Sequence, residues 1–208
     1  KGIRDSSSSL SDYVDTNRCP AKSFITNIKG LIALALSLVL SCNSHANPIP
    51  VNESADDYAV KAAYIYNILR FVSWPDSSPL AGTESLTICL FKEDPFSQYL
   101  DTISQKSVDS KQIKLKTIMS PSEAGPCHLV FIRESRNLKR FKEDSQLEHN
   151  DSILLGNDIE FVKNGGVFSF YIENNNVRLA ANRTAIANAR FKISSMLIEV
   201  CKLQGADR

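Results

Sequence analysis

Short apolar runs that alternate with helical patterns constrain the fold of this chain more than any other feature. Three of these runs have the length and composition of strands covered on both faces; they are residues 86–91, 127–132 and 152–156. A fourth segment, residues 112–118, alternates strictly between polar and apolar side chains, which is typical of a strand with one wet face near a sheet edge. Strands that alternate with helices usually pair in parallel, so this pattern predicts a mostly parallel sheet.

Helical patterns lie between and around these strands. A long helix over residues 54–73, with Ser54 or Asp56 as its cap, is apolar on nearly every side, which indicates burial against more than one neighbour. Trp74-Pro75 ends this helix, because proline disfavours helical geometry in the residue before it. Shorter helices are expected after Pro95, over residues 134–146 and over residues 158–162.

The last part of the chain predicts a hairpin and a final helix. Two strand patterns, residues 167–172 and 177–180, are joined by Glu-Asn-Asn-Asn, and asparagine tolerates the positive φ that tight turns demand. Asn182 can cap a last helix whose apolar residues recur at three-four spacing as far as Val200. The sequence therefore predicts a single α/β domain: a mixed, mostly parallel sheet with helices on both faces and a C-terminal antiparallel hairpin.

The first fifty residues predict export. Lys22 and Lys29 flank the start of a short apolar core, residues 31–40, and Ser44-His45-Ala46 supplies the small residues that a signal peptidase recognises. This core is shorter than the roughly 20 residues of a membrane span. A buried helix is the alternative, but Asn-Pro-Ile-Pro at residues 47–50 would break it.

We therefore divide the chain into four segments and expect a periplasmic location for the last. The segments are an upstream or disordered segment (1–21), a signal peptide (22–46), a linker (47–55) and the α/β domain (56–205). Val-Leu-Ser-Cys at residues 39–42 also resembles a lipobox, with an atypical leucine at its second position. A free mature protein is our expectation, and a lipid anchor through Cys42 is the alternative.

Charge and motifs exclude several classes of function. Residues 1–46 hold five of the 24 Lys and Arg and three of the 23 Asp and Glu, so the mature chain has 19 against 20 and a formal charge of −1. That balance is unlike the basic excess of a nucleic-acid binder. Five basic residues near position 137 are interleaved with acids, which favours a solvated helix face; they are Arg133, Arg136, Lys139, Arg140 and Lys142. Phosphate-binding glycine motifs, a nucleophile elbow and a spaced metal-ligand set are all lacking. We therefore expect no catalytic residue, metal or cofactor.

Three cysteines remain after cleavage: Cys89, Cys127 and Cys201. Cys89 and Cys127 fall in two predicted buried strands that we expect to be neighbours, and a disulfide is feasible if their Cα atoms lie within about 7 Å. An oxidising compartment permits such a bond, and two buried free thiols are the alternative. Cys201 is then unpaired, either as a packed thiol or as an intermolecular link.

Several sequence blocks together resemble the YfiR-like family. The first is Ala62-Ala63-Tyr64-Ile65-Tyr66-Asn67 running into Phe71-Val72-Ser73-Trp74-Pro75. Further blocks follow in the family's order, and they are Leu86–Cys89 with Asp94-Pro95-Phe96, Cys127–Ile132, Gly165–Phe170, Asn176–Leu179 and Lys192–Leu197. The resemblance covers residues 56 to 203, and its order and spacing are more specific than any single block.

The resemblance implies a non-catalytic periplasmic repressor that binds the periplasmic part of an inner-membrane diguanylate cyclase and so lowers cyclic-di-GMP. It also implies a homodimer, release by an outer-membrane peptidoglycan-binding lipoprotein, and a disulfide that matches Cys89 and Cys127. A second disulfide of the family has no counterpart here. The alternative is a periplasmic small-ligand-binding module that feeds a sensor kinase or cyclase, with its pocket at the carboxyl ends of the parallel strands.

Five residues are candidates for contact with a partner or ligand: Tyr64, Asn67, Trp74, Arg178 and Asn182. The first three lie on or next to the long helix, where core packing is the competing interpretation. Arg178 belongs to the second strand of the hairpin, with Asn182 beside it, and for Arg178 the competing interpretation is a surface ion pair.

Overall fold

The computed structural model of the protein describes residues 53–145 and 151–205. The predicted upstream segment, signal peptide and Cys42 lie outside the described residues, as do residues 47–52 of the predicted linker. In the part that is described, we find no helix with the length and apolarity needed to cross a membrane.

An eight-stranded mixed sheet forms the centre of the domain, in the order β10-β8-β7-β6-β5-β2-β4-β3. Its parallel part consists of β2 (Ser85–Phe91), β4 (Lys111–Ile118), β5 (Leu129–Ile132), β6 (Ile153–Gly156) and β7 (Phe168–Glu173). β8 (Asn176–Asn182) is antiparallel to β7, and the edges are β3 (Ser107–Val108) and β10 (Lys202–Gln204). This topology confirms the predicted fold class and places β4 next to an edge strand, as its alternating pattern indicated.

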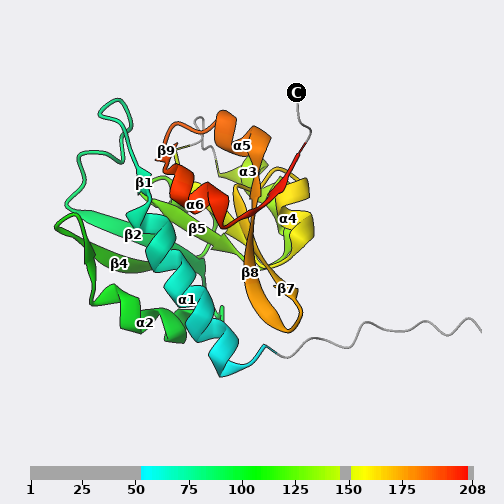
Figure 1. Ribbon diagram of the computed structural model, residues 1–208. Helices are drawn as coiled ribbons and strands as arrows, with labels where there is room; N and C mark the ends of the chain where they lie inside the picture. Colours follow the sequence, from blue (N-terminus) through cyan, green and yellow to red (C-terminus); the bar gives the residue numbers. More distant parts are fainter. Residues whose placement is uncertain (1–52, 146–150, 206–208) are drawn as a thin grey trace, which may run out of the picture. The chain divides into compact units, whose positions relative to one another are not determined.

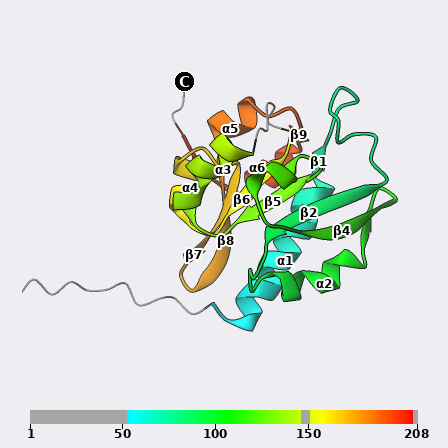
Figure 2. The same ribbon diagram turned by 180° about the vertical axis from the view of Figure 1, so that it is seen from behind.

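Helices cover both faces of the sheet (Figures 1 and 2). One face carries α1 (Ala55–Arg70), α2 (Ser97–Ser104) and α6 (Ser195–Glu199), and the other carries α3 (Leu138–Asp144) and α4 (Ile159–Lys163). Three short helical pieces complete the connections; they are η1 (Pro121–Ala124), η2 (Ser135–Asn137) and α5 (Arg183–Ala187). A separate two-stranded ladder pairs β1 (Val72–Ser73) with β9 (Lys192–Ile193).

Helix α1 begins with a capping box. The Ser54 hydroxyl accepts a hydrogen bond from the Asp57 amide at 3.1 Å, and the Asp57 carboxylate accepts one from the Ser54 amide at 3.0 Å. These bonds satisfy amide groups that have no partner within the helix. The buried side chains then recur at helical spacing, from Tyr58 through Ile65 to Leu69. Glu53 and Ser54, which we had assigned to the linker, thus already contact the domain.

The predicted hairpin is confirmed in detail. β7 and β8 pair antiparallel from Phe168 opposite Ala181 to Glu173 opposite Asn176. Asn174 and Asn175 form the turn with φ values of 50° and 59°, the conformation that asparagine tolerates better than most residues.

The single C-terminal helix that we predicted from Asn182 to Val200 is wrong. The structure has two short helices, α5 and α6, with β9 between them. Asn182 does act as a cap, since its side chain accepts from the Ala185 amide, but a second cap at Ser194 accepts from the Met196 amide and starts α6. Pairing of Ile193 with Val72 holds β9, which lies between α5 and α6, in an extended conformation. A tertiary contact therefore overrides the local helical spacing.

Cys89 of β2 and Cys127, just before β5, form a disulfide with a Cα–Cα distance of 5.8 Å. Both residues are buried, and β2 and β5 are neighbours in the sheet, as the strand pattern predicted. The bond therefore joins the two strands at the middle of the parallel sheet. Cys201 is not part of it, and its thiol lies 3.1 Å from the Leu197 carbonyl oxygen; burial raises the pKa of this thiol to about 12.

We predict that the Cys89→Ala/Cys127→Ala double variant loses roughly 3–4 kcal/mol of unfolding free energy, because the bond restricts the unfolded chain. Urea unfolding of the oxidised wild type and the double variant measures this loss, and reductant should destabilise the wild type but not the double variant. Cys201→Ala is the matched control, because it keeps the Cys89–Cys127 bond and should still lose stability when reductant is added. Peptide mapping of unreduced protein should show residues 89 and 127 in one linked pair. Alkylation of both thiols without reductant would contradict the bond.

Candidate functional site

The strand order reverses between β2 and β5, which makes this position the topological switch point of the parallel sheet. From β2 the chain crosses to β4 on one side, whereas from β5 it crosses to β6 on the other side. Because such crossovers are right-handed, α2 and α3 lie on opposite faces, as Figures 1 and 2 also show. A crevice at the carboxyl ends of two such strands is where open α/β sheets bind ligands. Asp94 follows β2 at this place and Arg133 follows β5.

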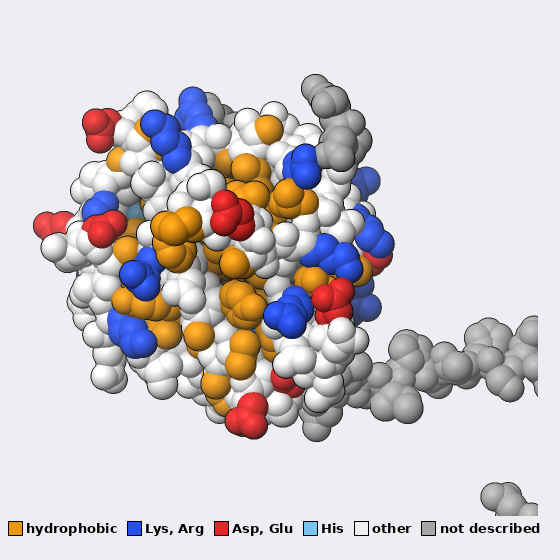
Figure 3. Space-filling view, in the orientation of Figure 1, with side chains coloured by type: hydrophobic (Ala, Val, Ile, Leu, Met, Phe, Trp, Pro, Cys, Tyr) orange, Lys and Arg blue, Asp and Glu red, His pale blue; other side chains and the backbone are white. Residues whose placement is uncertain are grey.

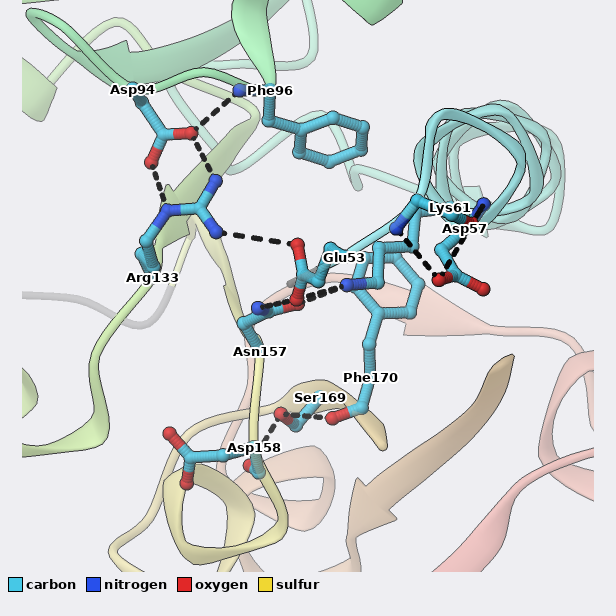
Figure 4. Close-up of polar contacts among 11 residues, drawn as sticks. Glu53, Asp57, Lys61, Asp94, Phe96, Arg133, Asn157, Asp158, Ser169 and Phe170 are labelled. Carbon is cyan, nitrogen blue, oxygen red and sulfur yellow. Dashed lines mark hydrogen bonds and ion pairs between the residues drawn. The ribbon is translucent and has the colours of Figure 1, made fainter. Parts of the chain in front are cut away.

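Arg133 and Asp94 form a two-point ion pair across this crevice (Figure 4). Nη2 of Arg133 lies 2.7 Å from Oδ1 of Asp94, and Nε lies 3.3 Å from Oδ2. The Asp94 carboxylate also accepts from the Phe96 amide at 2.9 Å. Burial alone would lower the pKa of Arg133, but the Asp94 carboxylate outweighs burial and raises it, so the guanidinium is a fixed positive charge.

A second polar group, made of residues at the start of α1 and directly after β6, contacts the same arginine through Glu53. Nζ of Lys61 lies 2.7 Å from both Glu53 Oε1 and Asn157 Oδ1, and the Asn157 amide also donates to Glu53. The other oxygen of Glu53 is 3.4 Å from Arg133. We call Glu53, Lys61, Asp94, Arg133 and Asn157 the edge network. It joins the start of α1 to the carboxyl ends of β2, β5 and β6.

Burial makes the edge network depend on its internal pairing. The Lys61 side chain is only 2% exposed, and burial lowers its pKa although Glu53 favours the charged form. Burial alone would raise the pKa of Glu53, but hydrogen bonds from Lys61 and Asn157 hold it below its ordinary value. The rings of Tyr58 and Phe170 lie 5.5 and 5.7 Å from the Lys61 ammonium and add cation–π contacts.

The backbone around Gly156 positions the β6 end of this network. A Cβ atom on Gly156 would lie 2.1 Å from the ring of Phe161, so a residue with a side chain does not fit there. Next in the chain, Asn157 enters the network and Asp158 caps α4 by accepting from the Phe161 amide. Asp158 also accepts from the Ser135 amide at 3.2 Å, which ties the loops after β5 and β6 together.

The charged side chains of the edge network pair with one another. Its two cations and two carboxylates neutralise one another, and each contacts an opposite charge within 3.4 Å. In residues 53–145 and 151–205, no group of three His, Cys, Asp or Glu side chains is placed to bind a metal ion.

The second candidate region is the outward side of α1 with the neighbouring α6, which we call the α1/α6 face. Between Asp57 and Arg70 the exposed residues of α1 are Ala59, Val60, Ala63 and Asn67, and none is charged. Large apolar side chains add to this face, with exposed fractions from 43% to 64%; they are Val60, Met196 and Val200. Figure 3 shows the resulting band of hydrophobic side chains over α1 and α6, with most charged side chains around it.

Two of the five predicted contact residues lie on the α1/α6 face. Asn67 is exposed there, and Tyr64 is half-buried with its ring 6.1 Å from that of Phe170. Arg178 is exposed on the hairpin, but it pairs with Tyr171 and so faces away from α1, on the side opposite Phe170.

The other two predicted contact residues are held in packing roles. The Trp74 indole donates to the Asp151 carbonyl oxygen at 2.7 Å and packs edge-on against His128. Asn182 is buried, caps α5 and donates to the Val162 carbonyl oxygen. A role of any of the five residues in binding stays a prediction.

Sequence reasoning missed the edge network. Lys61 lies within an apolar helix pattern that gives no sign of a buried charge, and Arg133 was grouped with the basic residues of a solvated helix. The signal that could have found Arg133 is its position directly after a buried strand, matched by Asp94 after the neighbouring strand.

The chain is similar in sequence to one known family and in structure to a solved protein. A family model described as YfiR/HmsC-like matches residues 58–202. No curated protein matches the chain. Among solved structures, the chain is similar to the crystal structure of a conserved domain protein from Vibrio cholerae O1 biovar eltor, at 10% sequence identity and a TM-score of 0.45. That alignment covers 70% of this chain and 59% of the other, so the chain spans little more than half of the solved relative.

We predict strong energetic coupling between Glu53 and Lys61. Glu53→Gln should cost about 3 kcal/mol of unfolding free energy, since it leaves the buried Lys61 ammonium without its carboxylate. The Glu53→Gln/Lys61→Met double variant should recover most of that loss, because it removes both charges. A double-mutant cycle by urea unfolding measures the coupling, and losses that simply add would show that the pair does not act as a unit.

Proposed function

Since the chain belongs to the YfiR/HmsC-like family, we propose that it is a non-catalytic periplasmic regulator that binds the periplasmic part of a membrane-bound diguanylate cyclase and holds that enzyme inactive. In this role the protein lowers cyclic-di-GMP through protein contact alone. Its location follows from the predicted signal peptide, with a lipid anchor through Cys42 as the alternative form.

The observation that supports this proposal most directly is the α1/α6 face. Helix α1 is apolar on nearly every side, and such a helix is normally covered by more than one neighbour. The sheet and α2 cover its inner side, whereas Val60, Ala63 and Asn67 are exposed. We infer that the missing neighbour of α1 is another protein.

The composition of the α1/α6 face fits a regulated protein contact. Met196 and Val200 provide large apolar side chains at its α6 end, and Tyr64 offers an aromatic ring beside an amide side chain at Asn67. Aromatic residues and methionine are enriched in the centres of protein interfaces, whereas charged residues are depleted there. Arg70 and Glu199 lie exposed next to this apolar centre and fit the polar rim of such an interface.

Further partners belong to the same proposal. We expect a homodimer and release of the cyclase by an outer-membrane peptidoglycan-binding lipoprotein that captures the regulator. The Cys89–Cys127 disulfide fits this setting, because an oxidising periplasm maintains it and it stabilises the two strands that carry Asp94 and Arg133.

We predict that Val60→Glu and Met196→Glu each reduce recovery of the cyclase at least tenfold, because each places a charge in an apolar contact. The measurement is a pull-down from solubilised inner membranes with the tagged regulator, with the cyclase quantified by mass spectrometry. Both side chains are exposed, so the variants should keep the thermal stability of the wild type.

Met119→Glu is the matched control, since Met119 is also a highly exposed methionine but follows β4, away from the α1/α6 face. The proposal fails if no inner-membrane cyclase is recovered with the wild type, or if the control loses the cyclase as the two face variants do. Light scattering of the same variants separates the homodimer from the cyclase contact: a change from dimer to monomer assigns the face to a second copy of the chain instead.

A further inference from the structure

His128 lies directly before β5, is fully buried, and has its protonation state fixed by its hydrogen bonds. The Thr87 amide of β2 donates to Nδ1 at 3.0 Å, so Nδ1 carries no hydrogen. Nε2 lies 3.1 Å from both the Leu80 carbonyl oxygen and the Thr83 hydroxyl. Because a carbonyl oxygen only accepts, Nε2 carries the hydrogen. The imidazole is therefore neutral, and its N–H points to the segment that connects β1 to β2.

The surroundings of His128 do not favour a positive charge. The contacts from β2 and from residues 80–83 are made by an amide, a carbonyl and a hydroxyl group. Asp151, before β6, directs its carboxylate to Arg190 at 3.8 Å, and within the described residues no carboxylate pairs with His128. Burial lowers the pKa of His128, the carbonyl bond at Nε2 opposes this in part, and the Lys111 ammonium of β4 lowers the pKa further.

Trp74 connects His128 to the α6 end of the α1/α6 face. Its ring stands nearly perpendicular to the imidazole, with ring centroids 4.8 Å apart, and lies 6.2 Å from the ring of Phe191. Phe191 directly precedes β9, which pairs with β1 beside α6 (Figure 1). After β9, Ser194 caps α6, and its amide donates to the Phe71 carbonyl oxygen at 2.9 Å. A continuous series of contacts therefore runs from His128 to the first turn of α6.

A second proton on His128 is incompatible with this arrangement. A hydrogen on Nδ1 would point at the Thr87 N–H group, and two donors cannot share one hydrogen bond. The buried imidazolium would also have no opposite charge beside it, which makes the charged form costly in this position. Either the imidazole or the Thr87 amide must therefore move. Movement of the imidazole breaks its bond to Leu80 and removes the ring against which Trp74 packs.

We propose that His128 is an acid-sensitive switch, whose protonation releases Trp74 and the segment around Leu80 from the sheet and thereby loosens β9 and α6. The folded state resists a proton that the open state accepts, so the closed state loses stability as the pH falls. The switch itself requires no partner protein. Its consequence for a partner rests on the proposed function, because α6 contributes Met196 and Val200 to the α1/α6 face.

The wild type reports on the switch by itself, because Trp74 is the only tryptophan of the chain. We expect its emission to shift reversibly to longer wavelength when the mature protein is acidified from about pH 7.5 to about pH 4.5, while the far-UV circular dichroism is retained. NMR of the ¹⁵N-labelled imidazole should show the Nε2–H form at neutral pH and protonation over the range of the emission shift. Protonation of His128 without a change at Trp74, or no protonation in this range, would overturn the proposal.

Hydrogen exchange distinguishes a local switch from unfolding of the whole domain. Below the transition we expect protection factors to fall at least tenfold at Thr87 and over residues 192–199. Those of α2, which is remote from His128 in the described contacts, should not change. A loss of protection shared by all elements would overturn the proposal, as would unchanged protection over residues 192–199.

Two single variants assign the response to one histidine. His128→Gln replaces the imidazole by an amide that does not titrate, so the pH-dependent changes in emission and exchange should disappear. His149→Gln is the matched control, since it removes the other histidine of the predicted mature chain and should keep both changes. An acid response that persists in His128→Gln, or that is lost in His149→Gln, would overturn the assignment.

The consequence for the partner is measured by the pull-down of the cyclase at two pH values. At a pH where the emission shift is complete, the wild type should lose the cyclase and His128→Gln should keep it. Recovery by the wild type at that pH would overturn the link between the switch and the α1/α6 face. Absence of the cyclase already at neutral pH, with the emission shift intact, would contradict the proposed function and leave the switch supported.

Discussion

Four charged side chains that pair with one another at the carboxyl edge of the sheet, from the buried Lys61 to the partly exposed Arg133, hold the rest of this site in place. Taking Lys61 and Glu53 out of water is expensive, and their attraction compensates only because Asn157 and Arg133 complete their hydrogen bonds. The same arginine holds Asp94 after β2. The edge network therefore fixes the start of α1 relative to three strands, and through α1 it fixes the α1/α6 face.

Local patterns predicted the parts of the fold that depend on local physics. The apolar runs predicted β2, β5 and β6, and the asparagines predicted the turn between β7 and β8, since few other residues tolerate positive φ there. The C-terminal helix was wrong because the spacing from Ile186 to Val200 satisfies a helix locally, while pairing of β9 with β1 is a contact between segments that are far apart in the chain. A pattern of one segment contains no information about such pairing.

The candidate site was harder to predict than the fold, for the same reason. Asn67 and Tyr64 were singled out from the family blocks and lie on an exposed face, whereas Trp74 and Asn182 proved to be held by the Asp151 and Val162 carbonyl groups. Arg133 and Arg140 look alike in sequence, yet Arg133 is part of the edge network, whereas Arg140 is 85% exposed on α3. Only the fold distinguishes a half-buried, paired arginine from a solvated one seven residues away.

The paired charges at one edge of the sheet and the apolar α1/α6 face together suggest a physical account of a regulator. The edge network and the disulfide connect β2, β5 and β6 to one another, and the α1/α6 face, which we propose as the partner contact, is apolar. The central claim is that the exported domain keeps a cyclase inactive, and cyclic-di-GMP in cells lacking the gene tests it most directly. We expect cyclic-di-GMP to rise in the deletion strain and to return to the wild-type level with the exported chain, but not with a chain that lacks residues 22–46. An unchanged or lower level in the deletion strain would contradict the account.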